Sequence, residues 1–133
     1  MGRIVMKWGG GLITDKTKLC TVLPNRIQSL AQTVREIYEM GHDIVIVHGA
    51  GSFGHIRAKK YRLAEGNIPE LDQSEAIQLV RQDMDKLHKH VLDSLGSLPV
   101  FSHPPRDFVL NTGDSFIGDL KQFTTPGIHV TFG

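Results

Sequence analysis

Two glycine-rich loops, each directly after a short apolar run, constrain this chain more than any other feature of its sequence. The first loop, Gly9–Gly11, follows the apolar run Ile4–Trp8, which Lys7 interrupts. The second loop, Gly49–Gly54, follows the run Asp43–His48. Short apolar runs that stop at glycines are typical of buried strands that end in loops. The sequence therefore predicts two strands whose carboxyl ends each carry a glycine loop.

Segments with helical periodicity separate the predicted strands. Apolar residues recur at helical spacing over 24–38, after a proline suited to a first helical turn and before the stop signal Gly41. A short helix is predicted over 55–60 and a long amphipathic helix over 72–95, where Asp72 is the expected N-cap. The remaining predictions are a polar loop over 62–71 and strands over 99–102 and 128–132.

Alternation of strands and helices predicts an α/β fold with a mainly parallel sheet, covered on both faces to give a three-layer αβα sandwich. A length of 133 residues suits one domain with an apolar core of its own. The last predicted strand runs to Gly133 without a following helix, so we expect this fold to be truncated.

Composition excludes several function classes. The net charge is +1, so no global attraction draws the chain to nucleic acid or to an anionic membrane. The single cysteine, Cys20, cannot form an internal disulfide, and no Cys/His spacing typical of a metal site surrounds it. No signal-peptide pattern and no apolar run of membrane-spanning length is present. We expect a cytoplasmic protein without a metal site of its own.

Both glycine loops have the chemistry of anion sites. Glycine lets the backbone approach a ligand closely, so that consecutive N–H groups line a pocket, and Lys7 adds a positive charge to the first loop. In an open parallel sheet, ligands bind outside the carboxyl ends of the strands. Both loops are therefore expected at one edge, with Lys16, Ser52 and His55 nearby. Two anion sites side by side suit phosphoryl transfer, which depends mainly on positioning and on neutralisation of charge.

The second loop, Gly49–Gly54, also matches the dinucleotide-binding fingerprint G-x-G-x-x-G. That fold would need a second strand ending in an acidic residue about 20 residues later. The corresponding region, 69–72, instead has the composition of a loop entering a helix. A dinucleotide site would also leave the first glycine loop unexplained.

The two loops together resemble the motifs of the amino acid kinase family. The segment Lys7–Lys16 is similar to the opening motif of that family, and Val47–His55 is similar to its second motif. The ending Ser52-Phe53-Gly54-His55 resembles the isopentenyl phosphate kinases and the related fosfomycin kinases in particular.

This resemblance implies the amino acid kinase fold and an ATP- and Mg²⁺-dependent phosphotransferase. The implied reaction converts isopentenyl monophosphate to isopentenyl diphosphate, as in the mevalonate pathway of isoprenoid precursor synthesis. By resemblance, the catalytic residues would be Lys7, Lys16 and His55. The ATP phosphates would contact Lys7, Gly9, Gly10, Gly11 and Lys16. The acceptor phosphate would contact Gly49, Ala50, Gly51, Ser52, Gly54 and His55.

The sequence departs from the family pattern in places. Gly11 stands where the family usually has serine, and Trp8 is bulkier than the usual leucine. The resemblance covers residues 1–133 as the N-terminal, acceptor-side portion of a family member, so the C-terminal ATP-binding portion is expected to be absent. A homodimer is compatible with the family, although no interface can be located.

Two alternatives to the isopentenyl phosphate kinase hypothesis remain. One is a fosfomycin-type or other small phosphonate or phosphate kinase, which shares the His55 motif. The other is a truncated, non-catalytic remnant that binds phosphate esters. The helical stripe Ile77, Val80, Met84 and Leu87 includes candidates for the wall of a prenyl pocket, although such a stripe is more often part of a core.

Overall fold

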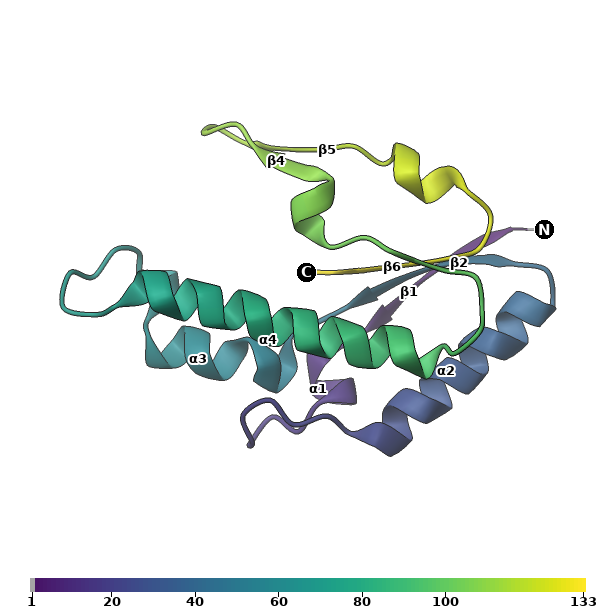
Figure 1. Cartoon of the computed structure of the whole chain (residues 1–133), viewed down its shortest axis with the longest axis horizontal. Coiled ribbons are helices and arrows are strands. Elements are labelled where there is room, and N and C mark those ends of the chain that lie inside the picture. The colour runs from purple at the N-terminus through teal and green to yellow at the C-terminus, as the bar shows by residue number, and fades with distance from the viewer. Residues whose placement is uncertain (1) are drawn as a thin grey trace.

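The computed structural model describes residues 2–133, apart from the side chain of Asn111. Six strands and four α-helices are present in this part of the chain, joined by short 3₁₀ turns (Figure 1). In chain order they are β1 (Arg3–Trp8), α1 (Gly10–Ile13), α2 (Pro24–Glu39), β2 (Asp43–His48), α3 (His55–Lys60), α4 (Gln73–Ser94), β3 (Val100–Ser102), β4 (Val109–Asn111), β5 (Phe116–Gly118) and β6 (Ile128–Phe132).

Four of the strands form a parallel sheet in the order β1-β2-β6-β3. In the register of this sheet, Trp8 lies opposite His48, and His48 lies opposite Phe132. The ends of β1, β2 and β6 are therefore aligned. This alignment brings the segments that follow β1 and β2 to one edge of the sheet, as expected for parallel strands.

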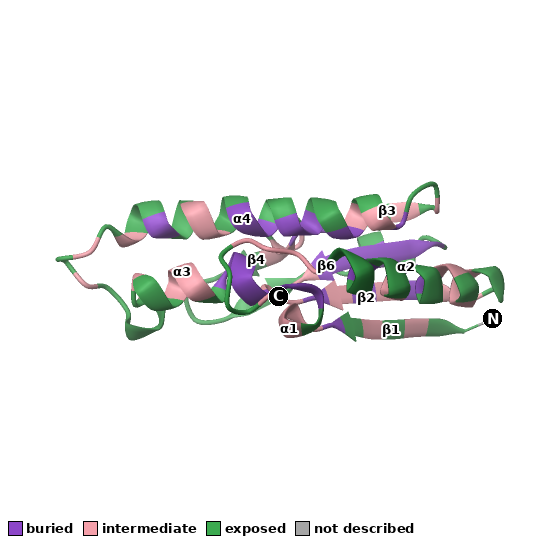
Figure 2. Ribbon diagram, turned by 90° about the horizontal axis from the view of Figure 1, so that it is seen from below, coloured by how far each residue is buried: buried purple, intermediate pink, exposed green. Residues whose placement is uncertain are grey.

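Helices α2 and α4 cover one face of the sheet. Alternate residues of the strands, such as Ile44, Ile46 and Val130, are fully buried against apolar residues of the two helices. The buried positions of α4 face the sheet and its exposed positions face away from it (Figure 2). Helix α4 begins as predicted, because the Asp72 side chain accepts a hydrogen bond of 3.2 Å from the Glu75 N–H.

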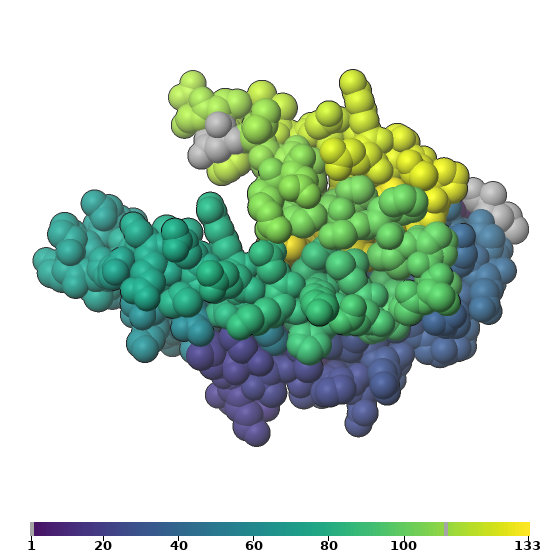
Figure 3. Space-filling model, viewed as in Figure 1, coloured from purple at the N-terminus to yellow at the C-terminus, as the bar shows by residue number. Residues whose placement is uncertain are grey.

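The opposite face carries the segment between β3 and β6. Within it, β4 and β5 form an antiparallel hairpin that projects from the body of the molecule (Figures 1 and 3). A 3₁₀ turn over Lys121–Thr124 packs Phe123 beside His129 of β6. Farther along this face, Val5 of the edge strand β1 remains 67% exposed. In the described residues, α-helices thus cover one face of the sheet and a looser segment covers part of the other.

The α/β class and the parallel sheet agree with the sequence prediction, and the predicted bounds of β2, α3 and β6 are those observed. Three details differ. β1 is an edge strand rather than a buried one, α1 is a helical turn where a flexible loop was expected, and the β4–β5 hairpin was not predicted. None of the helices in residues 2–133 is long and apolar enough to cross a membrane.

Candidate phosphate-binding site

The first glycine loop turns immediately into α1 at the end of β1. Gly9 is the N-cap, with φ −59° and ψ 144°, and the carbonyl of Gly9 accepts a 2.9 Å bond from the Leu12 N–H. The first N–H groups of a helical turn have no partner inside the helix. Accordingly, no hydrogen bond recorded among the described residues uses the N–H of Gly10 or Gly11. These two donors are available to an anion.

The second glycine loop forms a 3₁₀ turn, Gly51–Phe53, at the end of β2. Gly51 has φ +49°, a left-handed conformation that is costly for residues with a Cβ. The N–H groups of Phe53 and Gly54 are bonded to carbonyls inside the loop. Those of Ala50 and Gly51 take part in no hydrogen bond recorded for the described residues. The second loop therefore offers two further donors.

The two loops lie directly against each other. A Cβ on Gly10 would overlap the backbone nitrogen of Gly51, and a Cβ on Gly49 would lie 2.7 Å from the backbone nitrogen of Gly10. Thr14 joins the loops, because its hydroxyl donates to the Gly10 carbonyl over 2.6 Å and accepts from the Ser52 N–H over 3.0 Å. Close backbone approach is thus the physical reason for glycine at these positions.

A cavity of about 750 Å³ opens where the loops meet. Its wall combines backbone from both glycine loops with the cationic side chains of Lys7 and Lys16 and the imidazole of His55. Apolar side chains of Val47 and Ile56 complete one part of the lining. The full lining is Lys7, Gly9, Gly10, Gly11, Lys16, Val47, His48, Gly49, Ala50, Gly51, His55, Ile56 and Gly133.

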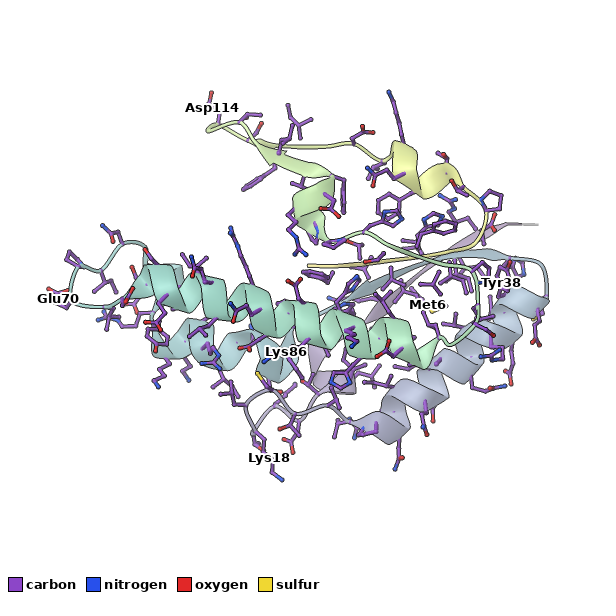
Figure 4. All side chains as sticks on the ribbon, viewed as in Figure 1. Met6, Lys18, Tyr38, Glu70, Lys86 and Asp114 are labelled. Carbon is purple, nitrogen blue, oxygen red and sulfur yellow. The ribbon has the colours of Figure 1, made fainter. Side chains whose placement is uncertain are left out.

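Lys16 reaches the cavity across the first loop. A Cβ on Gly11 would collide with the Lys16 side chain, with its Nζ 2.7 Å away, so the lysine lies over Gly11. Any larger side chain at position 11 would displace the end of the Lys16 side chain. Lys18, two residues later, projects away from the molecule and does not line the cavity (Figure 4). Lys18→Ala is therefore a suitable control for Lys16→Ala in a binding experiment.

Nine of the residues expected at the site line this cavity, and they come from β1, both loops, the segment after α1, and α3. Two others, Ser52 and Gly54, are not among the lining residues. The Ser52 hydroxyl accepts from the Thr21 N–H over 3.2 Å and lies 3.4 Å from the Thr21 carbonyl, so it secures the loop between α1 and α2. Among the candidate prenyl-pocket residues, Met84 and Leu87 belong to the hydrophobic core, Val80 packs against it and Ile77 is exposed. None of these residues lines the cavity.

Sequence reasoning assigned no site role to His48 or Thr14. His48 is fully buried, lines the cavity at the end of β2 and lies 3.0 Å from the Gly49 carbonyl through its Nδ1. Burial lowers the pKa of His48, and its contact with the Gly49 carbonyl opposes that shift only partly. A polar residue at the end of an apolar run, directly before the glycine loop, was the available signal for His48. No such sequence signal exists for Thr14, because the backbone groups that bond to its hydroxyl belong to two separate loops.

The lining fits the phosphates of a nucleotide or of a phosphate ester. It offers N–H donors, two lysines and glycine positions that a Cβ would fill.

The same lining, in the part of the chain that the structure describes, does not provide the ligands that a magnesium ion would need from the protein. Among the described residues, no group of three or more His, Cys, Asp or Glu side chains could hold a metal ion. The described side chains therefore offer no ligand set for a protein-bound magnesium ion.

Comparison with known proteins gives consistent results. A model of the amino acid kinase family matches residues 2–124. The isopentenyl phosphate kinase of Thermoplasma acidophilum is 33% identical over 92 residues, which are 69% of this chain and 36% of that protein. The isopentenyl phosphate kinase of Methanocaldococcus jannaschii is 26% identical over 141 residues, covering 94% of this chain and 54% of that protein.

Solved structures show the same likeness. The structure of the T. acidophilum isopentenyl phosphate kinase product complex superposes with a TM-score of 0.80 at 27% identity and covers 100% of this chain. That alignment uses 55% of the solved chain, so this chain spans about half the length of such relatives. An aspartate kinase from Synechocystis shares the fold, with a TM-score of 0.70 at 18% identity. By its sequence match, its parallel α/β fold and its paired glycine loops, this chain belongs to the amino acid kinase family.

Proposed function

We propose that this chain provides the acceptor-side part of an ATP-dependent kinase that converts isopentenyl monophosphate to isopentenyl diphosphate. The observation that supports this function best is the meeting of both glycine loops around one cavity with two lysines and His55. Similarity to isopentenyl phosphate kinases over most of the chain points to the acceptor.

The two loops would divide the phosphates between them. The N–H groups of Gly10 and Gly11 would hold the transferring phosphoryl group, and those of Ala50 and Gly51 would hold the acceptor phosphate. Fixed donors need little reorganisation as charge moves, and hydrogen bonds to charged groups are about twice as strong as neutral ones. The role of the loops is therefore to align the acceptor oxygen with the phosphorus atom that it attacks.

The cationic side chains would neutralise developing charge. Lys7 and Lys16 would bind phosphate oxygens, and His55 would donate a hydrogen bond to the acceptor phosphate. ATP, when bound, supplies the γ-phosphoryl group and leaves as ADP. An acceptor phosphate oxygen is already anionic at neutral pH, so the reaction needs no strong general base. His55 would thus orient the acceptor rather than deprotonate it.

An assay by ³¹P NMR tests this function. The protein is incubated with ATP, Mg²⁺ and isopentenyl monophosphate, and a parallel sample contains fosfomycin as the acceptor. Formation of isopentenyl diphosphate supports the proposal, whereas transfer to fosfomycin alone would replace it with a phosphonate kinase. Binding of isopentenyl monophosphate without any transfer would identify a phosphate-ester-binding protein that lacks catalysis of its own.

A further inference from the structure

Four buried histidines form two hydrogen-bonded pairs. On the face covered by α4, the Nε2 of His48 lies 3.0 Å from the Nδ1 of His88. On the opposite face, the Nε2 of His103 lies 2.7 Å from the Nδ1 of His129. All four residues are at most 5% exposed. Each pair must therefore satisfy its ring nitrogens within the protein.

A backbone carbonyl fixes the protons of the first pair. The Gly49 carbonyl can only accept, so the Nδ1 of His48, 3.0 Å away, carries a hydrogen and donates it. In a neutral ring the Nε2 of His48 is then an acceptor, and the Nδ1 of His88 must donate to it. The Nε2 of His88 accepts in turn from the Ser102 hydroxyl over 2.8 Å. Both histidines of this relay are Nδ1–H tautomers.

The second pair has the opposite tautomer. The Nε2 of His129 lies 2.6 Å from the Thr125 carbonyl, so this nitrogen carries the hydrogen. The Nδ1 of His129 then accepts from the Nε2 of His103. Both histidines of the second pair are therefore Nε2–H tautomers, which makes this pair an internal control for the first.

We propose that His48 and His88 are positioning residues for the phosphate cavity, acting as a neutral relay from Ser102 that holds the Gly49 carbonyl. In a planar trans peptide, the N–H of Ala50 points opposite to the Gly49 carbonyl, so holding one group fixes the direction of the other. The Ala50 N–H is one of the donors assigned above to the acceptor phosphate. This inference rests on that proposed function.

The relay requires both rings to stay neutral. A proton added to the Nε2 of His48 sets two N–H groups against each other, and a proton added to the Nε2 of His88 turns the Ser102 hydroxyl from the donor of the relay into an acceptor. Burial lowers the pKa of His88 to about 4, and His48, Arg106 and His103 act in the same direction, while Asp85 opposes them. The ring of Phe132, 5.0 Å from that of His88 between centroids, packs against the relay and offers no charge. The relay therefore remains neutral at physiological pH.

A ¹⁵N NMR spectrum of protein labelled at histidine nitrogens reads the tautomers directly at pH 7. We expect the Nδ1–H form for His48 and His88 and the Nε2–H form for His103 and His129. Single His→Asn variants assign the signals. An Nε2–H or imidazolium form of His48 or His88 would overturn the relay, whether or not the protein binds phosphate esters.

Variants test the positioning role. His88→Leu removes the donor to His48, His88→Asn retains a short side-chain donor, and His103→Leu breaks the other pair as a matched control. We expect His88→Leu to weaken binding of isopentenyl monophosphate about tenfold, His88→Asn to restore most of that loss, and His103→Leu to leave affinity within about threefold.

Calorimetric titration of each folded variant with isopentenyl monophosphate measures these changes, and circular dichroism confirms folding. Equal affinities of the His88→Leu and His103→Leu variants would overturn the positioning role. Failure of the unsubstituted protein to bind isopentenyl monophosphate or inorganic phosphate would instead overturn the proposed function and the positioning role that rests on it, leaving the tautomers as a separate result.

Discussion

Replacing Gly10 with alanine is expected to force the two glycine loops apart. An added Cβ at Gly10 would lie 2.7 Å from the Cα of Gly51 and 3.1 Å from the carbonyl carbon of Ala50, and real Cβ atoms essentially never approach closer than 3.0 Å. Optimal carbon contacts are about 3.5–4.0 Å, so the backbones must separate by roughly 1 Å. Overpacking of this kind costs about 1–3 kcal/mol.

Gly9→Ala is the matched control for Gly10→Ala. Nothing lies within 4 Å of a Cβ added to Gly9, whose φ of −59° suits any residue. Alanine favours helix over glycine by about 1 kcal/mol, so propensity alone would make Gly10→Ala stabilising. The contact between the two loops predicts the opposite result. Gly10→Ala should lower the free energy of unfolding by about 2 kcal/mol, and Gly9→Ala should change it by no more than about 0.5 kcal/mol.

Urea denaturation measures both stabilities, and calorimetric titration with isopentenyl monophosphate measures the site. We expect Gly10→Ala to bind isopentenyl monophosphate about tenfold more weakly than Gly9→Ala, because the added Cβ would push the Ala50 and Gly51 donors away from the acceptor phosphate. Equal stability and equal affinity of the two variants would refute the contact between the loops and the single cavity built on it.

Three further predictions concern charge. Lys16→Ala is expected to weaken binding of isopentenyl monophosphate or ATP by about tenfold in calorimetric titrations, whereas Lys18→Ala leaves it unchanged; equal effects would remove Lys16 from the site. The buried carboxylate of Asp83 is 3% exposed and pairs with Arg57 over 2.5 Å. Arg57→Ala removes this cation and is expected to lower the free energy of unfolding, measured by urea denaturation, by about 2 kcal/mol. The exposed pair of Arg106 and Asp85 provides the control, because Arg106→Ala should cost less than about 1 kcal/mol; a loss as large as that of Arg57→Ala would contradict this ranking. Lowering the pH from 6.5 to about 4 should reduce the free energy of unfolding by about 3 kcal/mol through His88, because the unfolded chain binds a proton there before the folded chain does. His88→Asn should lose that part of the pH dependence, and an unchanged dependence in urea denaturation at several pH values would contradict the pKa of His88.

Local sequence patterns were sufficient to predict most of the sheet and its helices. The run Asp43–His48 ends at a glycine, and Asp72 precedes a long amphipathic stretch, so both elements have clear boundaries. The β4–β5 hairpin lacks such a signal, because its strands have three residues each and Leu110 and Phe116 remain exposed. Helix α1 was missed because two of its four residues are glycines, which have low helix propensity.

The candidate site was predictable where chemistry follows from one segment of sequence. Glycine loops after parallel strands meet at one edge by topology, so their shared cavity could be anticipated. Contacts between residues that are far apart in the sequence could not be predicted in this way. His48 and His88 are 40 residues apart, and their pairing depends on how α4 packs over β2. Ser52 has the residue type of a phosphate ligand, but its hydroxyl contacts Thr21, which no local pattern indicates.

Amide NMR during separate titrations with isopentenyl monophosphate and with ATP tests the central claim most directly. The claim is that the two glycine loops bind the acceptor phosphate and the transferring phosphoryl group side by side in the cavity they share. We predict saturable shifts at the N–H groups of Ala50 and Gly51 with isopentenyl monophosphate and at those of Gly10 and Gly11 with ATP, with little change in the β4–β5 hairpin. Shifts that are largest outside both loops with either ligand would contradict the shared phosphate site.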